Sequence, residues 1–400
     1  MMKLNLDITV LVFTNELILL HLCFVHSHQI NQILRMEILD LISDAVTNVP
    51  ISYGDTKDFR KLIFSKLSRF KELIDSAEKT SSHPFLEHHN VFTYKRSIEK
   101  LIDGLLLSID NFYEGKPAKA YSTFSETMNS LDITEYLDKN SLLPCGSNLY
   151  RMRNAVGNYP LTIYELFHIP FEKRGLVQSQ RFSIPGLPSL YTANSIYVAW
   201  EEMRRPNVDT IQAIRLVNQR DIKLLDITTD IYNNNSEINT DNPSEILYKL
   251  LIWPLVACCS VKVKNINDTF KPEYIIPQLL LQWSNKNLDG IKYSSTHIDL
   301  NNTKHKGTFY NVVLPVKTFN VDKGYCRHLK RLFKSTNVLP MQLRQISTII
   351  DRFSHQSSIR SDINLNIEEL ELIEGTAQSY SQTLFGILEH GLSGIDIHSL

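Results

Sequence analysis

Apolar residues recur every three or four positions over the first third of the chain, which is the spacing of one helix face. Such stripes occupy residues 59–74, 98–109 and 120–131. Asp55 or Thr56 is placed to cap the first helix, Gly115 to end the second and Pro117 to begin the third. Because the links between such helices are short, the stripes predict an antiparallel helical domain over residues 36–140.

A different pattern begins near residue 145, where short apolar runs alternate with helical ones. Strands are expected at residues 163–169, 211–216, 222–227, 290–293 and 309–316, and helices at 195–204, 244–253 and 274–283. This alternation predicts a mixed α/β domain over residues 145–320. Helical patterning returns over residues 321–400, most clearly at 339–353 and 382–392. The expected fold class is therefore α+β, with helical regions on both sides of the mixed domain.

The first 35 residues do not fit this scheme. Residues 8–25 are apolar, but Asn15, Glu16 and His21 interrupt them. A signal peptide or a membrane span would need a cleaner apolar segment. Regular patterning starts only at Met36. We therefore interpret residues 1–35 as a doubtful leader or an over-extended start, and expect a cytoplasmic protein that does not engage a membrane.

Charge and cysteine usage exclude some function classes. The 42 Lys and Arg residues nearly balance the 43 Asp and Glu residues, which leaves a net charge of −1. The chain thus lacks the overall basic field of a nucleic-acid-binding protein. Its five cysteines, at positions 23, 145, 258, 259 and 326, have no zinc-binding spacing. We expect reduced core cysteines and no metal site.

The densest polar signals are five short motifs between residues 149 and 296. In chain order they read Tyr150-Arg-x-Arg, Arg181-Phe-Ser-x-Pro-Gly, Leu190-Tyr-x-Ala, a glutamate in the following helix, and Gly290-Ile-x-Tyr-x-Ser. Each motif alone has an ordinary explanation, such as surface arginines, a turn or a solvated helix face. Their common order and compatible gaps make the set more specific than any member.

Together these motifs resemble the RES-domain family, which is named for an Arg, a Glu and a Ser. The resemblance covers about residues 145–320, less than half of the chain. It implies a fold akin to ADP-ribosyltransferase toxins and a site that cleaves NAD⁺ between nicotinamide and ribose. Many members of the family are toxins that a helix-turn-helix antitoxin inhibits, so a protein antitoxin or regulator is an implied partner. NAD⁺ is implied as a substrate, and no cofactor is implied.

Position by position, the resemblance implies that Arg151 and Arg181 are the two site arginines and that Tyr191 is the site tyrosine. Arginine grips phosphate with a planar fork, so two arginines could clamp the pyrophosphate of NAD⁺. A tyrosine could stack on the cationic nicotinamide ring. Arg153 stays open: it could point to the opposite strand face, or share the face of Arg151 and contact a second phosphate.

The glutamate and the serine of the family pattern each have two candidates. Glu202 is favoured over Glu201, both by the family gap and because a helix capped at Ser195 would place Glu202 beside the buried stripe. Counting from the glycine of the last motif favours Ser295 over Ser294.

The carboxylate would stabilise the positive charge that develops on the ribose, and the serine would hold the ribose. The leading hypothesis is an NAD⁺ glycohydrolase or phosphorylase. A protein ADP-ribosyltransferase and a non-catalytic interaction protein that uses its helical region are the alternatives. The acceptor of the ADP-ribosyl group, whether water, phosphate or protein, stays open.

Overall fold

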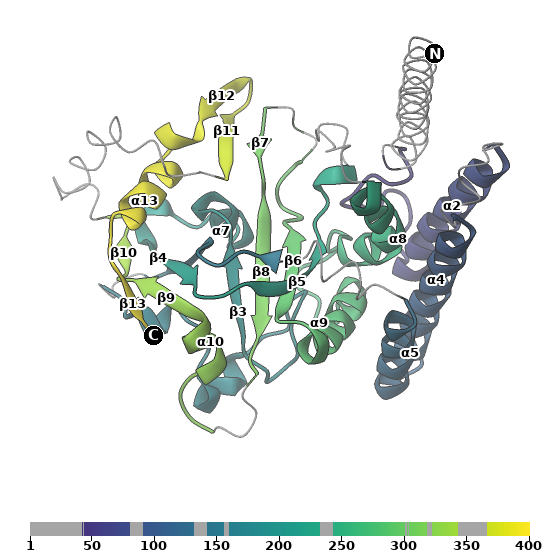
Figure 1. Ribbon diagram of the computed structural model, residues 1–400, viewed down its shortest axis with the longest axis horizontal. Helices are drawn as coiled ribbons and strands as arrows, with labels where there is room; N and C mark the ends of the chain where they lie inside the picture. The colour runs from purple at the N-terminus through teal and green to yellow at the C-terminus, as the bar shows by residue number, and fades with distance from the viewer. Residues whose placement is uncertain are drawn as a thin grey trace, which may run out of the picture.

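This computed structural model describes residues 42, 44–80, 91–131, 142–155, 160–232, 243–300, 302, 304–317, 322–342 and 366–400. Within them the chain is a mixed α+β structure, as the sequence predicts (Figure 1). The segment at 1–35 lies outside the described residues. No helix among the described residues has both the length and the apolar character needed to cross a lipid bilayer.

A large mixed sheet forms the centre of the molecule, in the strand order β1-β5-β6-β8-β3-β2-β4-β9-β13, with β10 paired to β4. Its strands are β1 Leu142–Leu143, β2 Asn148–Asn154, β3 Ser189–Ala193, β4 Ile211–Asn218, β5 Ile222–Ile227, β6 Gly290–Ser294, β8 Tyr310–Pro315, β9 Phe333–Thr336, β10 Leu339–Pro340 and β13 Ile397–Ser399. Within this described sheet only β5 and β6 pair in parallel. A smaller sheet contains β7 Lys306–Gly307, β11 Ile367–Ile373 and β12 Thr376–Ser379.

The sheet has a weak seam between β2 and β3. These two strands are registered at one pair, Tyr150 with Ala193. By contrast, β2 pairs with β4 from Asn148 to Asn154, and β3 pairs with β8 along its full length. Beyond the single pair, the backbone groups of β2 and β3 diverge, so side chains can reach between the two halves of the sheet.

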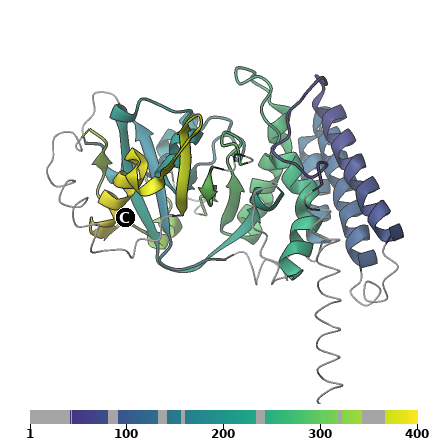
Figure 2. The same ribbon diagram turned by 90° about the horizontal axis from the view of Figure 1, so that it is seen from above.

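Helices cover one side of this sheet in two layers (Figures 1 and 2). The outer helices are α2 Phe59–Thr80, α4 Val91–Tyr113 and α5 Pro117–Asn129, and the inner ones are α8 Pro243–Cys259 and α9 Ile275–Asn287. One hydrophobic core joins both layers to β5, β6 and β8. The indole of Trp253 on α8 stacks on Phe70 of α2 at 4.2 Å and donates a 2.9 Å hydrogen bond to the Thr47 carbonyl. The expected helical domain at 36–140 therefore shares its core with the expected α/β domain at 145–320.

Local signals explain the ends of the outer helices. Gly115 ends α4 with a φ of +74°, which favours glycine, and Pro117 begins α5, as the sequence predicts. The first helix is capped differently from the expectation of Asp55 or Thr56. The Asp58 carboxylate accepts hydrogen bonds from the backbone N–H groups of Arg60 and Lys61, at 2.8 and 3.2 Å.

Several expected elements of the mixed domain are confirmed. The strands β4, β5, β6 and β8 and the helices α8, α9 and α7, which spans Ile196–Glu202, lie where the apolar runs predict them. The strand expected at 163–169 is wrong, because Ile163–Glu165 forms a 3₁₀ turn closed by a reciprocal capping box between Thr162 and Glu165. The two strands that flank the seam, β2 and β3, are not among the expected strands.

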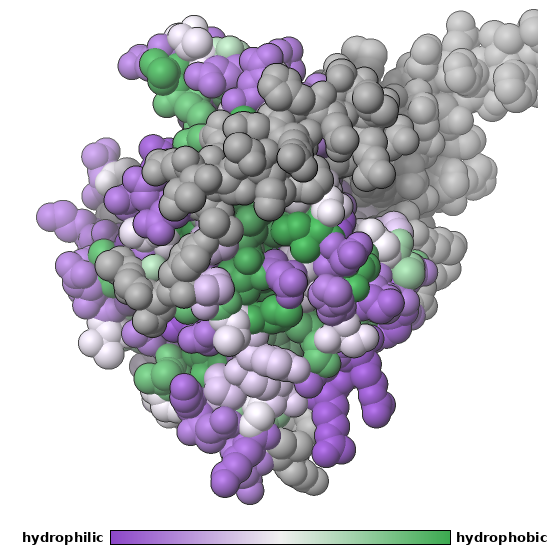
Figure 3. All heavy atoms as spheres, turned by 90° about the vertical axis from the view of Figure 1, so that its left-hand side faces the viewer, coloured by the Kyte–Doolittle hydropathy of each residue, from purple (hydrophilic) through white to green (hydrophobic). Residues whose placement is uncertain are grey.

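The expected helical extension at 321–400 is wrong for most of its described residues. Only α10 Arg327–Leu332 and α13 Leu384–Ser393 are α-helices there, and the latter matches the stripe at 382–392. The strands β9, β10 and β13 instead complete one edge of the large sheet. The first two residues of the helix expected at 339–353 instead form the strand β10. Residues 343–353 lie outside the described part. Figure 3 views this side, where an apolar area at the centre is surrounded by hydrophilic side chains.

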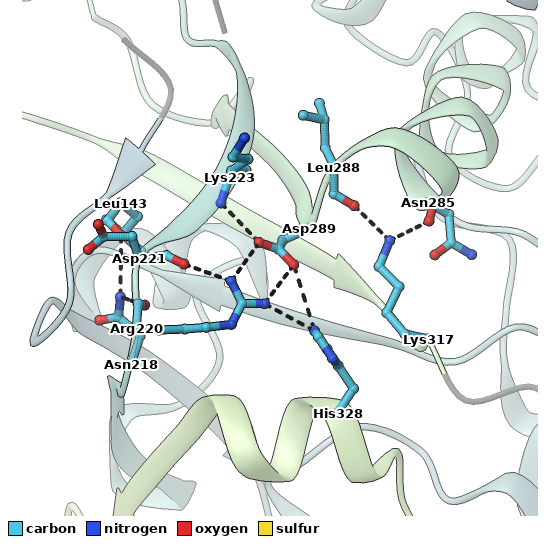
Figure 4. A network of polar contacts seen from close by, with 10 residues as sticks. All are labelled: Leu143, Asn218, Arg220, Asp221, Lys223, Asn285, Leu288, Asp289, Lys317 and His328. Atoms are coloured by element: carbon cyan, nitrogen blue, oxygen red, sulfur yellow. Dashed lines mark hydrogen bonds and ion pairs between the residues drawn. The ribbon is translucent and has the colours of Figure 1, made fainter. Parts of the chain in front are cut away.

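A polar network ties the loops beside β5 and β6 together (Figure 4). The Asp289 carboxylate receives both terminal nitrogens of Arg220, at 3.0 and 3.2 Å, and the backbone N–H of Lys223 at 3.0 Å. His328 of α10 lies 3.7 Å from the same carboxylate. These donors hold the pKa of Asp289 below its usual range, although burial opposes them. The network fixes the start of β6, which leads to the site described next.

Candidate functional site

A cavity of about 740 Å³ opens beside the seam of the large sheet. Its wall includes residues from β2, β3, β6, β8 and α7. Five residues singled out from the sequence line it: Arg151, Arg181, Tyr191, Glu202 and Ser294. A cavity of this size is typical of small-molecule and cofactor sites, which span about 300–1,000 Å³.

Arg151 lies in the seam itself. Its Nη1 donates a 2.6 Å hydrogen bond to the Tyr191 carbonyl, so the side chain joins β2 to β3 where the strand ladder is missing. Its Nε is buried without a hydrogen-bond partner among the described residues. Burial lowers the pKa of Arg151 to about 10, which leaves the guanidinium charged at neutral pH. A cation that lines a cavity without a paired carboxylate among the described residues favours an anionic ligand.

Arg181 reaches the same cavity from the loop before β3. Its Nη1 donates to the carbonyls of Cys259 and Val261, at 2.8 and 2.9 Å, and its Nη2 donates to Thr296 Oγ1 at 3.4 Å. The guanidinium also lies 5.6 Å from the ring centre of Tyr274. No carboxylate among the described residues forms an ion pair with Arg151 or Arg181.

Tyr191 contributes its ring to the cavity wall from the middle of β3. Its hydroxyl donates a 2.6 Å hydrogen bond to the Phe182 carbonyl. Burial raises the pKa of this phenol, so it stays protonated. The ring is thereby held in a fixed orientation toward the cavity.

The two adjacent glutamates of α7 face different surroundings. Glu202 lines the cavity, and its Oε1 accepts a 3.0 Å hydrogen bond from the Asn311 amide of β8. Glu201 lies outside the cavity, is 2% exposed, and pairs with Arg205 at 2.9 Å. The helical argument, which placed Glu202 rather than Glu201 beside the buried stripe, is thus wrong about burial, because Glu201 is the more deeply buried of the two and pairs with Arg205. The favoured residue, Glu202, is nevertheless the one on the cavity wall.

The two serines are placed the other way round from the expectation. Ser294 lines the cavity, whereas the favoured Ser295 does not. The Ser295 hydroxyl instead accepts a 3.1 Å hydrogen bond from the His297 backbone N–H, which closes a turn. The Ser294 hydroxyl accepts from the Thr229 N–H at 2.9 Å and donates to Asp230 Oδ1 at 3.2 Å. The end of the strand explains the difference, because β6 ends at Ser294 and Ser295 belongs to the turn that follows it.

Arg153 shares β2 with Arg151 but does not line the cavity. It is exposed, and its Nη1 donates a 3.0 Å hydrogen bond to the Glu165 carbonyl. Arg151 thus bridges the seam and lines the cavity, whereas Arg153 lies at the surface.

Some cavity residues have no role in the sequence-based model. Asn311 is 3% exposed and orients Glu202, but it lies in an apolar run where only its polarity marks it. Tyr293 belongs to the last motif and packs on Phe182, with ring centres 4.5 Å apart. Tyr274 lies within electrostatic range of Arg181, Arg204 and Glu202. Two tyrosines and an amide therefore surround the proposed charged groups.

The charge on the cavity wall is unbalanced. Among the described residues that line it, the cations are Arg151, Arg181, Arg204 and Lys262, and the carboxylate is Glu202. This excess of positive charge favours an anionic ligand. A carboxylate beside such a ligand is suited to stabilising a local positive charge within it.

Comparison with known proteins adds one relationship. Over 332 residues the chain is 30% identical to a protein of Bacillus subtilis (strain 168) named "Putative toxin YopC". The aligned region covers 80% of this chain and 70% of that protein. No family model matches the chain, and no solved structure matches it.

Proposed function

Because the chain belongs to the YopC family, we propose that it acts as a toxin, and that its cavity cleaves NAD⁺ between nicotinamide and ribose. The RES-like assignment and the likeness to ADP-ribosyltransferases are parts of this proposal. An antitoxin that inhibits the enzyme stays a prediction from the family resemblance, as does a cytoplasmic location.

The observation that carries the proposal is Arg151. Its guanidinium is charged, held in the seam by Tyr191, and retains a buried Nε without a partner among the described residues. The pyrophosphate of a dinucleotide in the cavity would supply the opposite charge for this guanidinium. Arg181 lies on the same wall and would engage the second phosphate.

The remaining groups suit the cleavage step. As the bond between C1′ and nicotinamide breaks, its electron pair leaves with nicotinamide and the ribose acquires positive charge. Glu202, oriented by Asn311, would stabilise that charge. Tyr191 would pack on nicotinamide and limit the access of water. An acceptor oxygen then bonds to C1′ and releases its proton.

The test incubates the purified full chain with NAD⁺ and identifies the products by mass. Free ADP-ribose supports hydrolysis, and ADP-ribose carrying a phosphate on C1′ supports phosphorolysis. Mass added to the protein instead supports the alternative, transfer to a side chain. Unchanged NAD⁺ with a folded protein would refute the cleavage reaction.

Glu202→Gln separates chemistry from folding, because it keeps the size of the side chain and removes its charge. We expect turnover to fall about 10²- to 10³-fold, with a smaller change in KM. Glu126→Gln, on the exposed face of α5, is the matched control and should retain full activity. Full activity of Glu202→Gln would remove the carboxylate from the mechanism.

A further inference from the structure

We propose that Arg204, which follows the catalytic helix α7, is a third ligand of the substrate pyrophosphate and is aimed by a strained turn. None of the sequence motifs assigns a role to this residue. The inference rests on the proposed function, because it names how the same cavity recognises a dinucleotide.

The turn after α7 has an unusual backbone. Arg204 and Arg205 have φ values of +62° and +53°, and they are the only described residues other than glycine with positive φ. This left-handed region is unfavourable for side chains that carry a Cβ atom, and it is visited mostly by glycine and asparagine. A helix end needs at most one such residue, and capping alone favours glycine there. Two successive arginines therefore require another explanation.

Specific contacts hold this turn in place. The Arg205 Nε donates to Glu201 Oε2 at 2.9 Å, and the Arg205 guanidinium lies 5.6 Å from the ring centre of Trp200. Trp200 Nε1 donates a 2.9 Å hydrogen bond to the Pro206 carbonyl. Backbone N–H groups of Arg204 and Arg205 reach back to the carbonyls of Glu201 and Trp200, at 2.9 and 3.0 Å. Strained backbone persists where neighbouring contacts determine it this fully, and such sites are often functional.

The result of this geometry is the position of Arg204. Its side chain lines the cavity that also holds Glu202 and Arg181, and the residue remains exposed. Both Arg181 and Arg204 lie within electrostatic range of the Tyr274 phenol. No carboxylate among the described residues forms an ion pair with Arg204. Three arginines, from β2, from the loop before β3 and from the turn after α7, thus converge on one cavity.

This arrangement assigns the two glutamates of α7 to different tasks. Glu202 faces the cavity, whereas Glu201 acts through Arg205 and is a positioning residue for Arg204. Buried pairing of Glu201 is what allows the chain to turn back and present Arg204 beside Glu202.

Arg204→Gly gives a sharp test, because glycine relieves the strain while it removes the ligand. Calorimetry compares ADP-ribose, which carries the pyrophosphate, with nicotinamide riboside, which lacks it. We expect affinity for ADP-ribose to fall roughly 10- to 100-fold, affinity for the riboside to stay constant, and Tm to stay equal or rise. Glu201→Gln should cause a smaller loss with the same selectivity. Arg331→Ala, outside the cavity on α10, is the control for lost charge.

The outcomes distinguish a failure of the role of Arg204 from a failure of the proposed function. If Arg204→Gly binds ADP-ribose as the wild type does, Arg204 is no ligand and the inference is overturned while the proposed function stands. An equal loss for both ligands also overturns it, because the contact would not involve the pyrophosphate. If the wild type binds neither ligand, the proposed function falls, and the inference falls with it.

Discussion

His168 is buried between its own loop and the start of α10, where its ring makes two hydrogen bonds. Nδ1 donates to the Ile169 carbonyl at 2.8 Å, and Nε2 accepts the Cys326 N–H at 2.8 Å. This pattern requires a neutral ring, and burial lowers the pKa of His168 to about 4. Protonation would place a second proton where Cys326 donates. The stability of the fold therefore depends on His168 staying neutral, and so on pH.

Glu389 on α13 responds in the opposite direction. Its Oε1 accepts a 2.6 Å hydrogen bond from the Ile196 N–H, at the start of α7, and another from the Tyr380 hydroxyl. Burial raises the pKa of this carboxyl to about 8, so the folded protein keeps it protonated at neutral pH. The unfolded chain would release that proton above a pKa of about 4.5.

The two residues should largely offset one another between pH 7 and pH 5. The unfolded chain takes up a proton at His168 below about pH 6.5 that the fold refuses, so acidification costs about 2 kcal/mol of stability. At Glu389 the folded protein is already protonated at pH 7, whereas the unfolded chain binds that proton only near pH 4.5. Acidification from pH 7 to pH 5 therefore raises the free energy of unfolding by about 2.5 kcal/mol. In the wild type these two opposing changes nearly cancel, so the free energy of unfolding changes little between pH 7 and pH 5.

Single substitutions should expose them. His168→Gln leaves the Glu389 response alone, so its free energy of unfolding should rise by about 2 kcal/mol, relative to the wild type, from pH 7 to pH 5. Glu389→Gln imitates the protonated carboxyl, and its free energy of unfolding should fall by about 2.5 kcal/mol relative to the wild type over the same range. Urea unfolding at pH 7, 6 and 5 measures both slopes. Slopes of the variants that match the wild type would refute the assignment of these protons.

Two further changes test the framework around the site. Gly290→Ala would place a Cβ atom 2.2 Å from the Val313 carbonyl oxygen, so we expect unfolding to become easier by at least ~2 kcal/mol, whereas Gly175→Ala meets open space and should be nearly neutral in the same urea assay. Asp289→Asn weakens the pair with the half-exposed Arg220, so Tm should fall by an amount equivalent to about 1 kcal/mol, and the difference from wild type should shrink in high salt.

The sequence predicts best those parts of the fold that carry continuous apolar runs. The strands β4 and β8 are buried along nearly their whole length, so their apolar composition identifies them. The strand β2 is different, because Arg151 and Arg153 alternate with Tyr150 and Met152, so β2 carries no continuous apolar run. Arg151 is in the cavity and Arg153 is at the surface. Arg151, which gives β2 its role in the cavity, is thus also one of the residues that break the apolar run by which a strand was recognised.

Other errors have local or long-range causes. The capping box of Thr162 and Glu165 was readable as a Thr-x-x-Glu signal and outweighs the apolar run that suggested a strand. No local signal could place β9 and β13 together, because they pair across more than 60 residues. The expected core cysteines are Cys258, Cys259 and Cys326 in the structure, whereas Cys145 is exposed.

For the site, the order of motifs singled out four residues that all line one cavity: Arg151, Arg181, Tyr191 and Glu202. Counting from the glycine favoured Ser295, but β6 ends at Ser294, and it is Ser294 that lines the cavity. The contribution of Arg204 depends on a backbone conformation that its sequence disfavours. Local propensity therefore could not reveal it.

The shared core of the two helical layers has a consequence for synthesis on the ribosome. The stripes of α2, α4 and α5 emerge first, but α8 and α9, against which they pack, emerge more than 100 residues later. The contact between Thr47 and Trp253 spans 206 residues. Until then the nascent chain exposes three apolar surfaces, the condition in which chaperones engage and aggregation competes. A protein assembled in this order would complete its cavity only after β8, which carries the lining residue Asn311, has been made.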